Sequence, residues 1–493
     1  MSANSNPYLA LGVRPFINCC SVRTMHGGSL MLPQVREAMA EASRWFVNLD
    51  ELMEAAGRRL ALLTGAEWGI VTCGSAAAVA LGTAACVAGN DPVRMLRLPF
   101  TEGMVNRVII PRTQRFAYDQ AVRMIGCHIV EIDTREELDR ALEEPVAMVV
   151  LLGKQEHLCP VRLEEFAAIM KPRDIPIMVD AASEHLERPS PWLARGADLV
   201  IYSGGKFLRG PQTSGLLLGS KRLVEAAWRN ASPHQALGRP MKVSKEDIIG
   251  ALAAVEYWFE ERDRGAERQK WYDDLAIIAE RIGRMPGAGS EIVEPVGVDL
   301  VPRLRVSWDR VEYPIDGLGL RQRALDGEPR IMLDDNSATD NAIEIDPFQL
   351  QPREAAEVGD TIAAVLGASR RNVFEPARPA PIEIGGEWEM RVDFLHGART
   401  HRLNIEQRGA ELAGHQRSTG FEGPVSGALR GNAVRLAFSG HYEGSTISYL
   451  FDGEIRGGGM SGTALLGAAS DQNAGIVNKS QFGAGSWQAQ RVG

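Results

Sequence analysis

Short apolar runs alternate with segments of helical periodicity through the first half of the chain. The apolar runs include RVIIP, HIVEI, VAMVVLL, PIMVD and DLVIYS, and stretches such as REELDRAL and RLEEFAAIM stand between them. Apolar strands separated by amphipathic helices are typical of right-handed βαβ units around a mainly parallel sheet. The pattern therefore predicts an irregular arm at residues 1–30, followed by a large α/β domain at residues 31–243.

Three further helical segments of this domain are predicted from residue spacing. A helix begins at Pro33 and runs to about Phe46, with Val35, Met39 and Ala42 at helical intervals. The stretch FAYDQAVRMIG forms a second helix, and a helix-like spacer separates PIMVD from DLVIYS.

The pattern changes after residue 243. A long helical stretch leads into a smaller α+β region, predicted over residues 244–367, and the Pro- and Arg-rich residues 368–385 predict a linker. Over residues 386–493, short alternating runs are separated by Gly-containing turns, as in antiparallel β structure. We expect a small antiparallel sheet or partial barrel there, serving either packing and assembly or substrate specificity.

Composition and charge narrow the possible functions. The formal net charge of −9 over 493 residues gives no electrostatic support for nucleic-acid binding. No apolar run reaches the roughly 18 residues of a membrane span, and the N-terminus lacks a signal-peptide pattern, so we expect a cytoplasmic protein. The six cysteines show no CxxC spacing, and the histidines after residue 386 match no metal-ligand pattern. Reduced thiols and the absence of a metal site are the expectations.

The strongest chemical signal lies between residues 179 and 219. Asp180 closes the apolar run PIMVD, and Lys206 follows the run DLVIYS after a Gly-Gly turn. Open α/β sheets bind ligands at the carboxyl ends of their strands, which is where both charges are expected. A lysine there can form a Schiff base with an aldehyde cofactor, and an aspartate can pair with a protonated pyridine nitrogen. Pyridoxal phosphate requires both partners, although each residue alone would more often be an ordinary loop charge.

A second signal precedes a long Ala-rich helix. Gly74, Ser75 and Ala76 open that helix directly after the apolar run WGIVTC. Small residues at a helix start expose backbone N–H groups, and the helix dipole favours an anion there. In isolation this turn indicates a plain N-cap serine. Together with Lys206 it predicts a cradle for the cofactor's phosphate.

Residues 15–365 resemble the fold-type I pyridoxal-phosphate enzymes of the selenocysteine synthase and D-glucosaminate-6-phosphate ammonia-lyase-like group. The resemblance is carried, in order, by PFIN at 15–18, LDELMEAAGRRLALLTGAE at 49–67, CGSAAA at 73–78, VDAAS at 179–183, SGGKFLRGPQTSGLLLG at 203–219 and GRPMKVSKEDIIGALAA at 238–254. It implies the aspartate aminotransferase-like α/β fold with a mainly parallel sheet and a small α+β subdomain. The all-β domain after residue 386 is an addition to that family core.

The resemblance also implies roles for individual residues. Lys206 would carry the cofactor and move the proton at the substrate α-carbon, while Asp180 would keep the pyridine nitrogen protonated. The residues implied to touch the cofactor elsewhere are Gly74, Ser75, Ala76 and Ser203 at the phosphate, Ser183 at the phenolic oxygen, Gln114 against the ring, and Thr213 toward a neighbouring subunit. A homodimer or higher homo-oligomer follows, because sites of this family form at subunit interfaces.

Residues that bind the substrate are less well defined by the sequence. Arg330 and Arg209 are candidates for pairing with a carboxylate, since a guanidinium can donate two parallel hydrogen bonds. His26 and His234 are candidates for a second acid or base. A structural role is at least as common for such arginines and histidines.

The expected reaction is a dehydrating ammonia-lyase reaction on an amino acid or aminosugar acid. The same α-carbon chemistry also allows a racemase or an aldolase. Selenium transfer to a seryl-tRNA ranks lower, because only Arg14 and Arg23 supply positive charge before residue 30. A non-catalytic scaffold is a further alternative, disfavoured because Lys206, Asp180 and Ser75 are all present.

Overall fold

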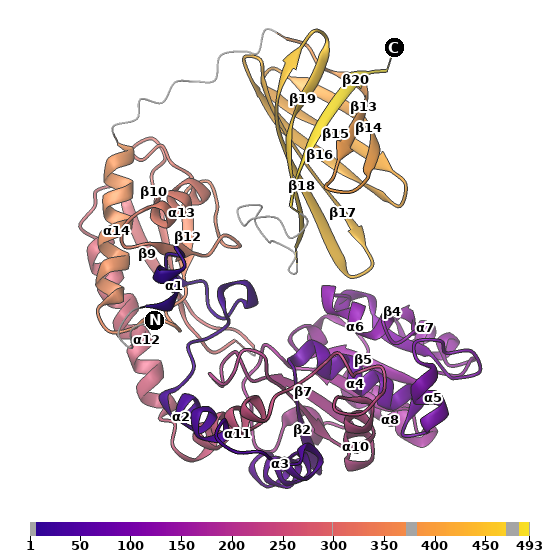
Figure 1. Ribbon diagram of the computed structural model, residues 1–493. Helices are drawn as coiled ribbons and strands as arrows, with labels where there is room; N and C mark the ends of the chain where they lie inside the picture. Colours follow the sequence, from indigo (N-terminus) through magenta and orange to yellow (C-terminus); the bar gives the residue numbers. More distant parts are fainter. Residues whose placement is uncertain (1–5, 298, 371–381, 470–482, 493) are drawn as a thin grey trace. The chain divides into compact units, whose positions relative to one another are not determined.

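The computed structural model describes residues 6–297, 299–370, 382–469 and 483–492 (Figure 1). Most of the predicted linker, residues 371–381, lies outside the described residues. The chain forms two compact units. One unit comprises Met1–Val306, Leu325–Leu333 and Glu344–Thr361, and the other comprises Ser307–Ala324, Asp334–Ile343 and Ile362–Gly493. The domain boundaries expected from the sequence remain a prediction.

The first unit is built on a seven-stranded sheet in the order β2-β8-β7-β6-β5-β3-β4. Its strands are β2 (Trp68–Thr72), β3 (Arg107–Pro111), β4 (His128–Ile132), β5 (Met148–Leu152), β6 (Ile177–Asp180), β7 (Leu199–Ser203) and β8 (Gly215–Gly219). β8 runs antiparallel to both of its neighbours, whereas the pairs among β3 to β7 are parallel. The mainly parallel sheet predicted from the apolar runs is therefore confirmed.

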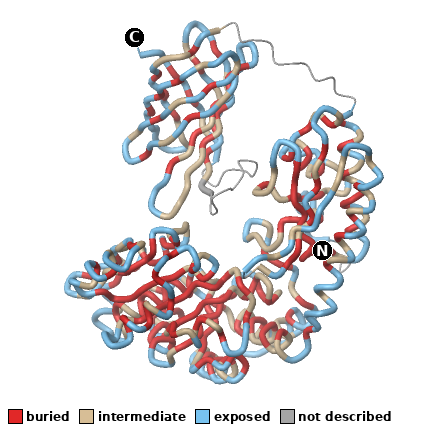
Figure 2. The backbone as a smooth tube through the Cα atoms, turned by 180° about the vertical axis from the view of Figure 1, so that it is seen from behind, coloured by how far each residue is buried: buried red, intermediate tan, exposed pale blue. Residues whose placement is uncertain are grey.

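The central strands are buried along almost their whole length (Figure 2). Helices cover the sheet because strands that are apolar at every position must be shielded on both faces. The helices of this part are α2 (Pro33–Ala42), α3 (Leu49–Thr64), α4 (Ser75–Ala88), α5 (Pro92–Arg97), α6 (Gln120–Arg123), α7 (Arg135–Ala141), α8 (Leu163–Met170), α9 (Pro191–Ala194), α10 (Lys221–Asn230) and α11 (Lys245–Glu260). The small residues of α4 permit close packing: a Cβ atom on Gly82 would lie 2.7 Å from the sulfur of Met178.

Three predicted helices are shorter in the structure. α2 ends at Ala42, and the exposed stretch after it contains Trp45 and Phe46. FAYDQAVRMIG forms a 3₁₀ turn, Ala117–Asp119, followed by the four-residue α6. The spacer before β7 contains only the four-residue α9, because prolines at 189 and 191 prevent a continuous helix.

The N-terminal arm is more ordered than expected. It contains the short helix α1 (Pro7–Ala10), the strand β1 (Ile17–Cys19) and a 3₁₀ turn at Thr24–His26. β1 pairs in parallel with β11 (Ile331–Leu333), so the arm is held by the chain around residue 331.

The predicted α+β region follows α11. A three-stranded sheet has the order β12-β10-β9, and long helices accompany it. The elements of this region are α12 (Arg264–Ile282), β9 (Ala288–Val293), β10 (Arg303–Trp308), α13 (Gly317–Asp326), β12 (Ala342–Ile345) and α14 (Glu354–Ser369). None of the helices in the described ranges is both long and apolar enough to cross a membrane.

Within the second unit, eight antiparallel strands form a closed barrel. They are β13 (Gly386–Asp393), β14 (Ala398–Arg408), β15 (Glu411–Ser418), β16 (Phe421–Arg430), β17 (Ala433–Tyr442), β18 (Ser445–Arg456), β19 (Gly459–Ala469) and β20 (Ala484–Arg491). Buried and exposed positions alternate along β13 and β14, as in a sheet with one face in a core. The predicted antiparallel domain is confirmed, and β13 pairs with β20 to close it.

Candidate active site

The sheet places Asp180 and the lysine loop, residues 203–214, at the carboxyl ends of two neighbouring strands. Asp180 is the last residue of β6 and pairs with Ile201 of β7, three residues before Gly204. Two glycines let the loop fold tightly: a Cβ atom on Gly204 would lie 2.0 Å from the Ser214 hydroxyl, and one on Gly205 would lie 2.4 Å from the Gln212 Cα. The turn preceding Lys206 therefore requires glycine at both positions.

Asp180 is buried and has one fixed hydrogen-bond donor. Its Oδ1 accepts a hydrogen bond of 2.9 Å from the backbone N–H of Ala182. Burial raises the pKa of Asp180 above its ordinary value, while the Ala182 N–H and the positive charge of Lys206 act in the opposite direction. A buried carboxylate of this kind is stabilised by a cation beside it, such as a protonated pyridine nitrogen.

The start of α4 abuts the lysine loop. Gly74 has a φ of 105°, a conformation that favours glycine, and it precedes Ser75 without a side-chain cap. Gly215 begins β8 directly after the loop, and a Cβ atom there would lie 2.5 Å from the Gly74 carbonyl carbon. The first turn of α4, with Ser75 partly buried and Ala76 exposed, therefore lies beside the lysine loop.

Gln114 lies at the same edge of the sheet. Its side-chain oxygen accepts a hydrogen bond of 2.8 Å from the N–H of Leu152, and Leu152 pairs with Asp180. The Gln114 side chain is fully buried, and its Nε2 has no hydrogen-bond partner among the described residues. An unused buried donor beside Asp180 is the kind of group that a polar ligand satisfies.

The three remaining cofactor candidates occupy different surroundings. Ser203 ends β7, the strand next to Asp180. It pairs with Gly215, the residue that approaches the first turn of α4. Ser183 is partly buried in a turn. A hydrogen bond of 2.9 Å from the Glu184 N–H to the Ala181 carbonyl closes this turn. Thr213 is exposed.

The N-terminal arm lies on the lysine loop. The N–H and hydroxyl of Ser29 both donate to the Gly205 carbonyl, at 3.1 and 3.0 Å. Arg209 has a φ of 55° and donates from Nε to the Leu30 carbonyl at 3.0 Å. The arm therefore contacts the lysine loop at Gly205 and Arg209. His26, three residues before Ser29, packs its ring edge-on against Phe16, with 5.4 Å between the ring centroids.

Arg330 and His234 are engaged in structural contacts. Arg330 donates to the backbone carbonyls of Leu325 and Arg14, both at 3.1 Å. His234 contacts the carbonyl of Trp228 with Nδ1 and Asp50 with Nε2, both at 3.0 Å. These contacts tie chain segments together, and none of them involves the lysine loop. The carboxylate-binding role expected of Arg330 and the acid–base role expected of His234 remain predictions.

Two residues shortly after Asp180, one buried and one partly buried, were not anticipated from the sequence. Glu184 accepts a hydrogen bond of 2.8 Å from the Trp192 indole, and burial raises its pKa to about 7. His185 packs against Phe207 at 4.6 Å, and burial lowers its pKa to about 4. No signal in the sequence singled out this pair, because consecutive polar residues after a strand are typical of loops that face solvent.

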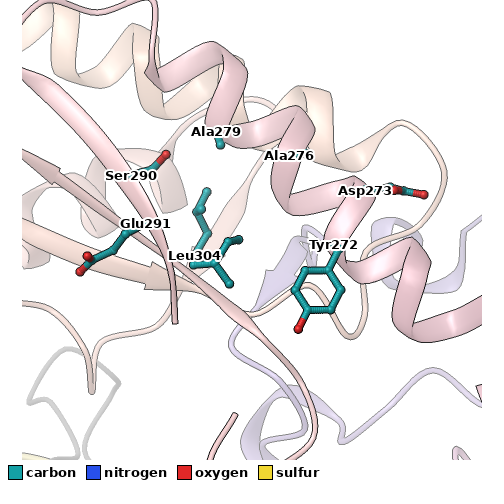
Figure 3. Close-up of a pocket in the computed structure, with 8 residues that line it drawn as sticks. Tyr272, Asp273, Ala276, Ala279, Ser290, Glu291 and Leu304 are labelled. Carbon is teal, nitrogen blue, oxygen red and sulfur yellow. The ribbon is translucent and has the colours of Figure 1, made fainter. Parts of the chain in front are cut away.

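A separate hollow lies between α12 and β9 (Figure 3). Its volume is about 460 Å³, and Leu304, Ala276 and Ala279 contribute apolar surface while Asp273 and Glu291 stand at its sides. It includes no lysine and none of the predicted site residues, so it offers no alternative place for a Schiff base.

Comparison with known proteins identifies the family. The chain is 31% identical over 385 residues to the D-glucosaminate-6-phosphate ammonia lyase of Salmonella typhimurium, covering 76% of this chain and 99% of that enzyme. The chain belongs to the D-glucosaminate-6-phosphate ammonia lyase family. The solved structure of a D-glucosaminate-6-phosphate ammonia-lyase superposes with a TM-score of 0.66 at 28% identity, covering 74% of this chain and 99% of that one.

Other members of the wider group are also similar to this ammonia-lyase family protein. A 5'-C-glycyluridine monooxygenase-decarboxylase of a Streptomyces species is 32% identical over 70% of this chain and 88% of its own length. An L-seryl-tRNA(Sec) selenium transferase of Yersinia pestis is 24% identical over 57% of this chain and 64% of its own length. No family model matches the chain.

Membership in the ammonia lyase family confirms three predictions. The protein has the fold predicted from the resemblance, it is an enzyme of the ammonia-lyase type, and its cofactor is pyridoxal 5'-phosphate. The residues fit this cofactor: Lys206 offers an amine, Asp180 a buried carboxylate, the first turn of α4 a set of backbone donors, and Gln114 Nε2 an unused donor. The racemase, aldolase, selenium-transfer and scaffold alternatives are not favoured.

Proposed function

We propose that the protein releases ammonia from an aminosugar acid by way of an initial dehydration, with Asp180, Lys206 and the Ser75 turn as its cofactor site. The observation that carries this proposal is the meeting of these three features at one sheet edge, in a chain that matches an ammonia lyase over 99% of that enzyme's length. A 2-amino-3-hydroxy acid would lose its β-hydroxyl as water, and hydrolysis would then release ammonia. The net products are a 2-keto-3-deoxy acid and one ammonia.

Lys206 is the proposed acid and base. Its amine takes the proton from the substrate α-carbon, and the Gly204-Gly205 turn fixes the position from which it does so. When bound, pyridoxal phosphate supplies an electron sink for the electron pair left at that carbon. Asp180 stabilises positive charge on the ring nitrogen, and its burial in a low-dielectric environment strengthens that interaction.

The remaining residues are proposed to bind and orient. Backbone N–H groups at Ser75 and Ala76, with the Ser75 and Ser203 hydroxyls, hold the phosphate at the positive end of α4. Gln114 and Ser183 donate to the ring substituents, and Thr213 reaches a neighbouring subunit. Arg209 is the better candidate for the substrate carboxylate, because it stands in the lysine loop, whereas Arg330 already donates to two backbone carbonyls.

A second candidate reaction rests on the 32% identity to the monooxygenase-decarboxylase. Such an enzyme would use the same site to remove a carboxyl group with consumption of dioxygen. The two reactions differ in their products. Holoenzyme is incubated with D-glucosaminate-6-phosphate, unphosphorylated D-glucosaminate and a glycyl nucleoside, and ammonia, carbon dioxide and oxygen are measured. Ammonia release from the sugar acids without oxygen uptake supports the proposal, and carbon dioxide release with oxygen uptake contradicts it.

We further propose that the protein is a homodimer or higher homo-oligomer. Trp45 is 64% exposed and Phe46 is fully exposed, directly after α2. Trp45 lines an apolar hollow of about 430 Å³, together with residues that include Ala38, Val47 and Ile249. Light scattering of the wild type and of Phe46→Glu tests the proposal: a dimer that dissociates in the variant supports this surface, and a monomeric wild type refutes oligomerisation.

A cytoplasmic location is proposed on the state of the cysteines. The six cysteines are unbridged in the structure, and burial raises the pKa of Cys19 and Cys86. Inert, unpaired thiols fit a reducing compartment. Fractionation of cells that express the full chain tests this, and recovery from the periplasm or medium would contradict it.

A further inference from the structure

Among the described residues of the barrel, one end of the interior is polar and the rest is apolar. Along the barrel, inward-facing residues such as Leu403, Leu429 and Phe451 form a hydrophobic core. Near the hairpin that joins β15 to β16, the inward positions of the neighbouring strands are instead His401 and Gln416, both fully buried. Polar side chains are seldom buried in this way without a function or a full set of hydrogen bonds.

The polar groups at this end are incompletely paired. His401 Nδ1 and Gln416 Oε1 lie 2.9 Å apart and form one hydrogen bond. His401 Nε2, Gln416 Nε2 and the Ser418 hydroxyl are buried and have no hydrogen-bond partner among the described residues. Because the amide oxygen accepts from Nδ1–H, the free ring nitrogen is an acceptor and the amide nitrogen is a donor. An acceptor, a donor and a hydroxyl are thus unused at one end of the barrel.

Aromatic rings surround this polar group. The His401 ring lies 6.1 Å from Phe421, 5.1 Å from Phe438 and 5.8 Å from Tyr449, and the latter two are 5.2 Å apart. Gly440 lets the Phe421 ring lie against β17, since a Cβ atom there would be 2.6 Å from that ring. Aromatic walls favour a planar ligand, which can stack or meet them edge to face.

The surroundings also select an uncharged ligand. Burial lowers the pKa of His401, so its ring is neutral near pH 7 and offers no charge to pair with an anion. Eight-stranded barrels have interiors that side chains fill or that hold one small molecule. We propose that this end of the barrel binds a small, uncharged planar molecule with an adjacent hydrogen-bond donor and acceptor, such as a carboxamide or lactam.

Benzamide is a suitable probe because it joins a ring to one donor and one acceptor. Saturation-transfer NMR on the full-length holoenzyme compares benzamide with toluene, which lacks the polar group, and benzoate, which is charged. We expect benzamide to bind about tenfold more tightly than toluene or benzoate, because one additional hydrogen bond changes a binding affinity by about that factor. Gln416→Leu should weaken benzamide binding about tenfold, while Thr400→Ala, an exposed neighbour on β14, should leave it unchanged.

Ser418→Ala removes only a hydroxyl and keeps the test valid if Gln416→Leu does not fold. A weaker affinity for benzamide in Ser418→Ala supports the proposal. Absence of benzamide binding, or an affinity that neither variant changes, overturns it. A crystal structure of the full chain soaked in benzamide, with ordered water alone on the three polar atoms, would also overturn it.

Discussion

A Cβ atom on Gly215 would lie 2.6 Å from the backbone nitrogen of Ser75. This approach joins the two halves of the proposed cofactor site, because Gly215 begins the strand after the lysine loop and Ser75 begins α4. Gly215→Ala should displace the α4 turn, weaken pyridoxal-phosphate binding at least about tenfold and cost about 1–3 kcal/mol of stability. Spectroscopic titration of the apoenzyme with the cofactor, together with urea unfolding, measures both effects.

Gly289→Ala is the matched control for Gly215→Ala. Gly289 lies in β9 with no atom within 4 Å of the position that its Cβ would take. Its substitution should change neither cofactor affinity nor stability appreciably. Equal cofactor affinity in Gly215→Ala and wild type would show that the close approach does not shape the site.

Asp180→Asn should leave the fold intact and reduce kcat about 10²–10³-fold, since a buried charge that stabilises the ring nitrogen is lost. Asp198→Asn is the control, because Asp198 lies before β7 and accepts a hydrogen bond of 2.8 Å from the Ile177 N–H. The control should lower the unfolding free energy with little loss of kcat. Steady-state kinetics and circular dichroism on both variants check the distinction, which fails if the two lose kcat equally.

Glu184 should give the protein a pH-dependent stability. Its folded pKa of about 7 exceeds the ordinary value of 4.5, so the folded state binds this proton more tightly than the unfolded state. The resulting stabilisation is complete below about pH 4.5 and is lost as the pH rises through 7, up to about 3 kcal/mol. Urea unfolding of apoenzyme at pH 5 and pH 8 should show this loss in the wild type and a smaller loss in Glu184→Gln.

The Glu184→Gln amide can still accept from the Trp192 indole, so its hydrogen bond is kept while the titration is removed. Glu143→Gln, at an exposed position, serves as the control and should keep the wild-type pH dependence. If Glu184→Gln and Glu143→Gln show the same change between pH 5 and pH 8, Glu184 does not titrate in this range.

The positions of Asp180, Lys206 and Ser75 at or just after strand ends could be predicted from the sequence, because each lies beside a recognisable apolar run. The close approach of Gly215 to Ser75 could not, since it depends on β8 returning antiparallel between β2 and β7. The helix expected at FAYDQAVRMIG is shorter in the structure, where Phe116 is extended with a φ of −152° and Ala117–Asp119 form a 3₁₀ turn before α6. Barrel closure depends on pairing between the first and last strands, which local periodicity does not encode.

The central claim is that Lys206 carries the cofactor, and chemical mapping tests it without relying on activity. Holoenzyme is reduced with borohydride, digested, and analysed by mass spectrometry for the phosphopyridoxyl group. We predict that the group is attached to Lys206, is absent in Lys206→Ala, and is unchanged in Lys221→Ala, an exposed position on α10. A phosphopyridoxyl group on another lysine, or none on the wild type after saturation with pyridoxal phosphate, would contradict the account.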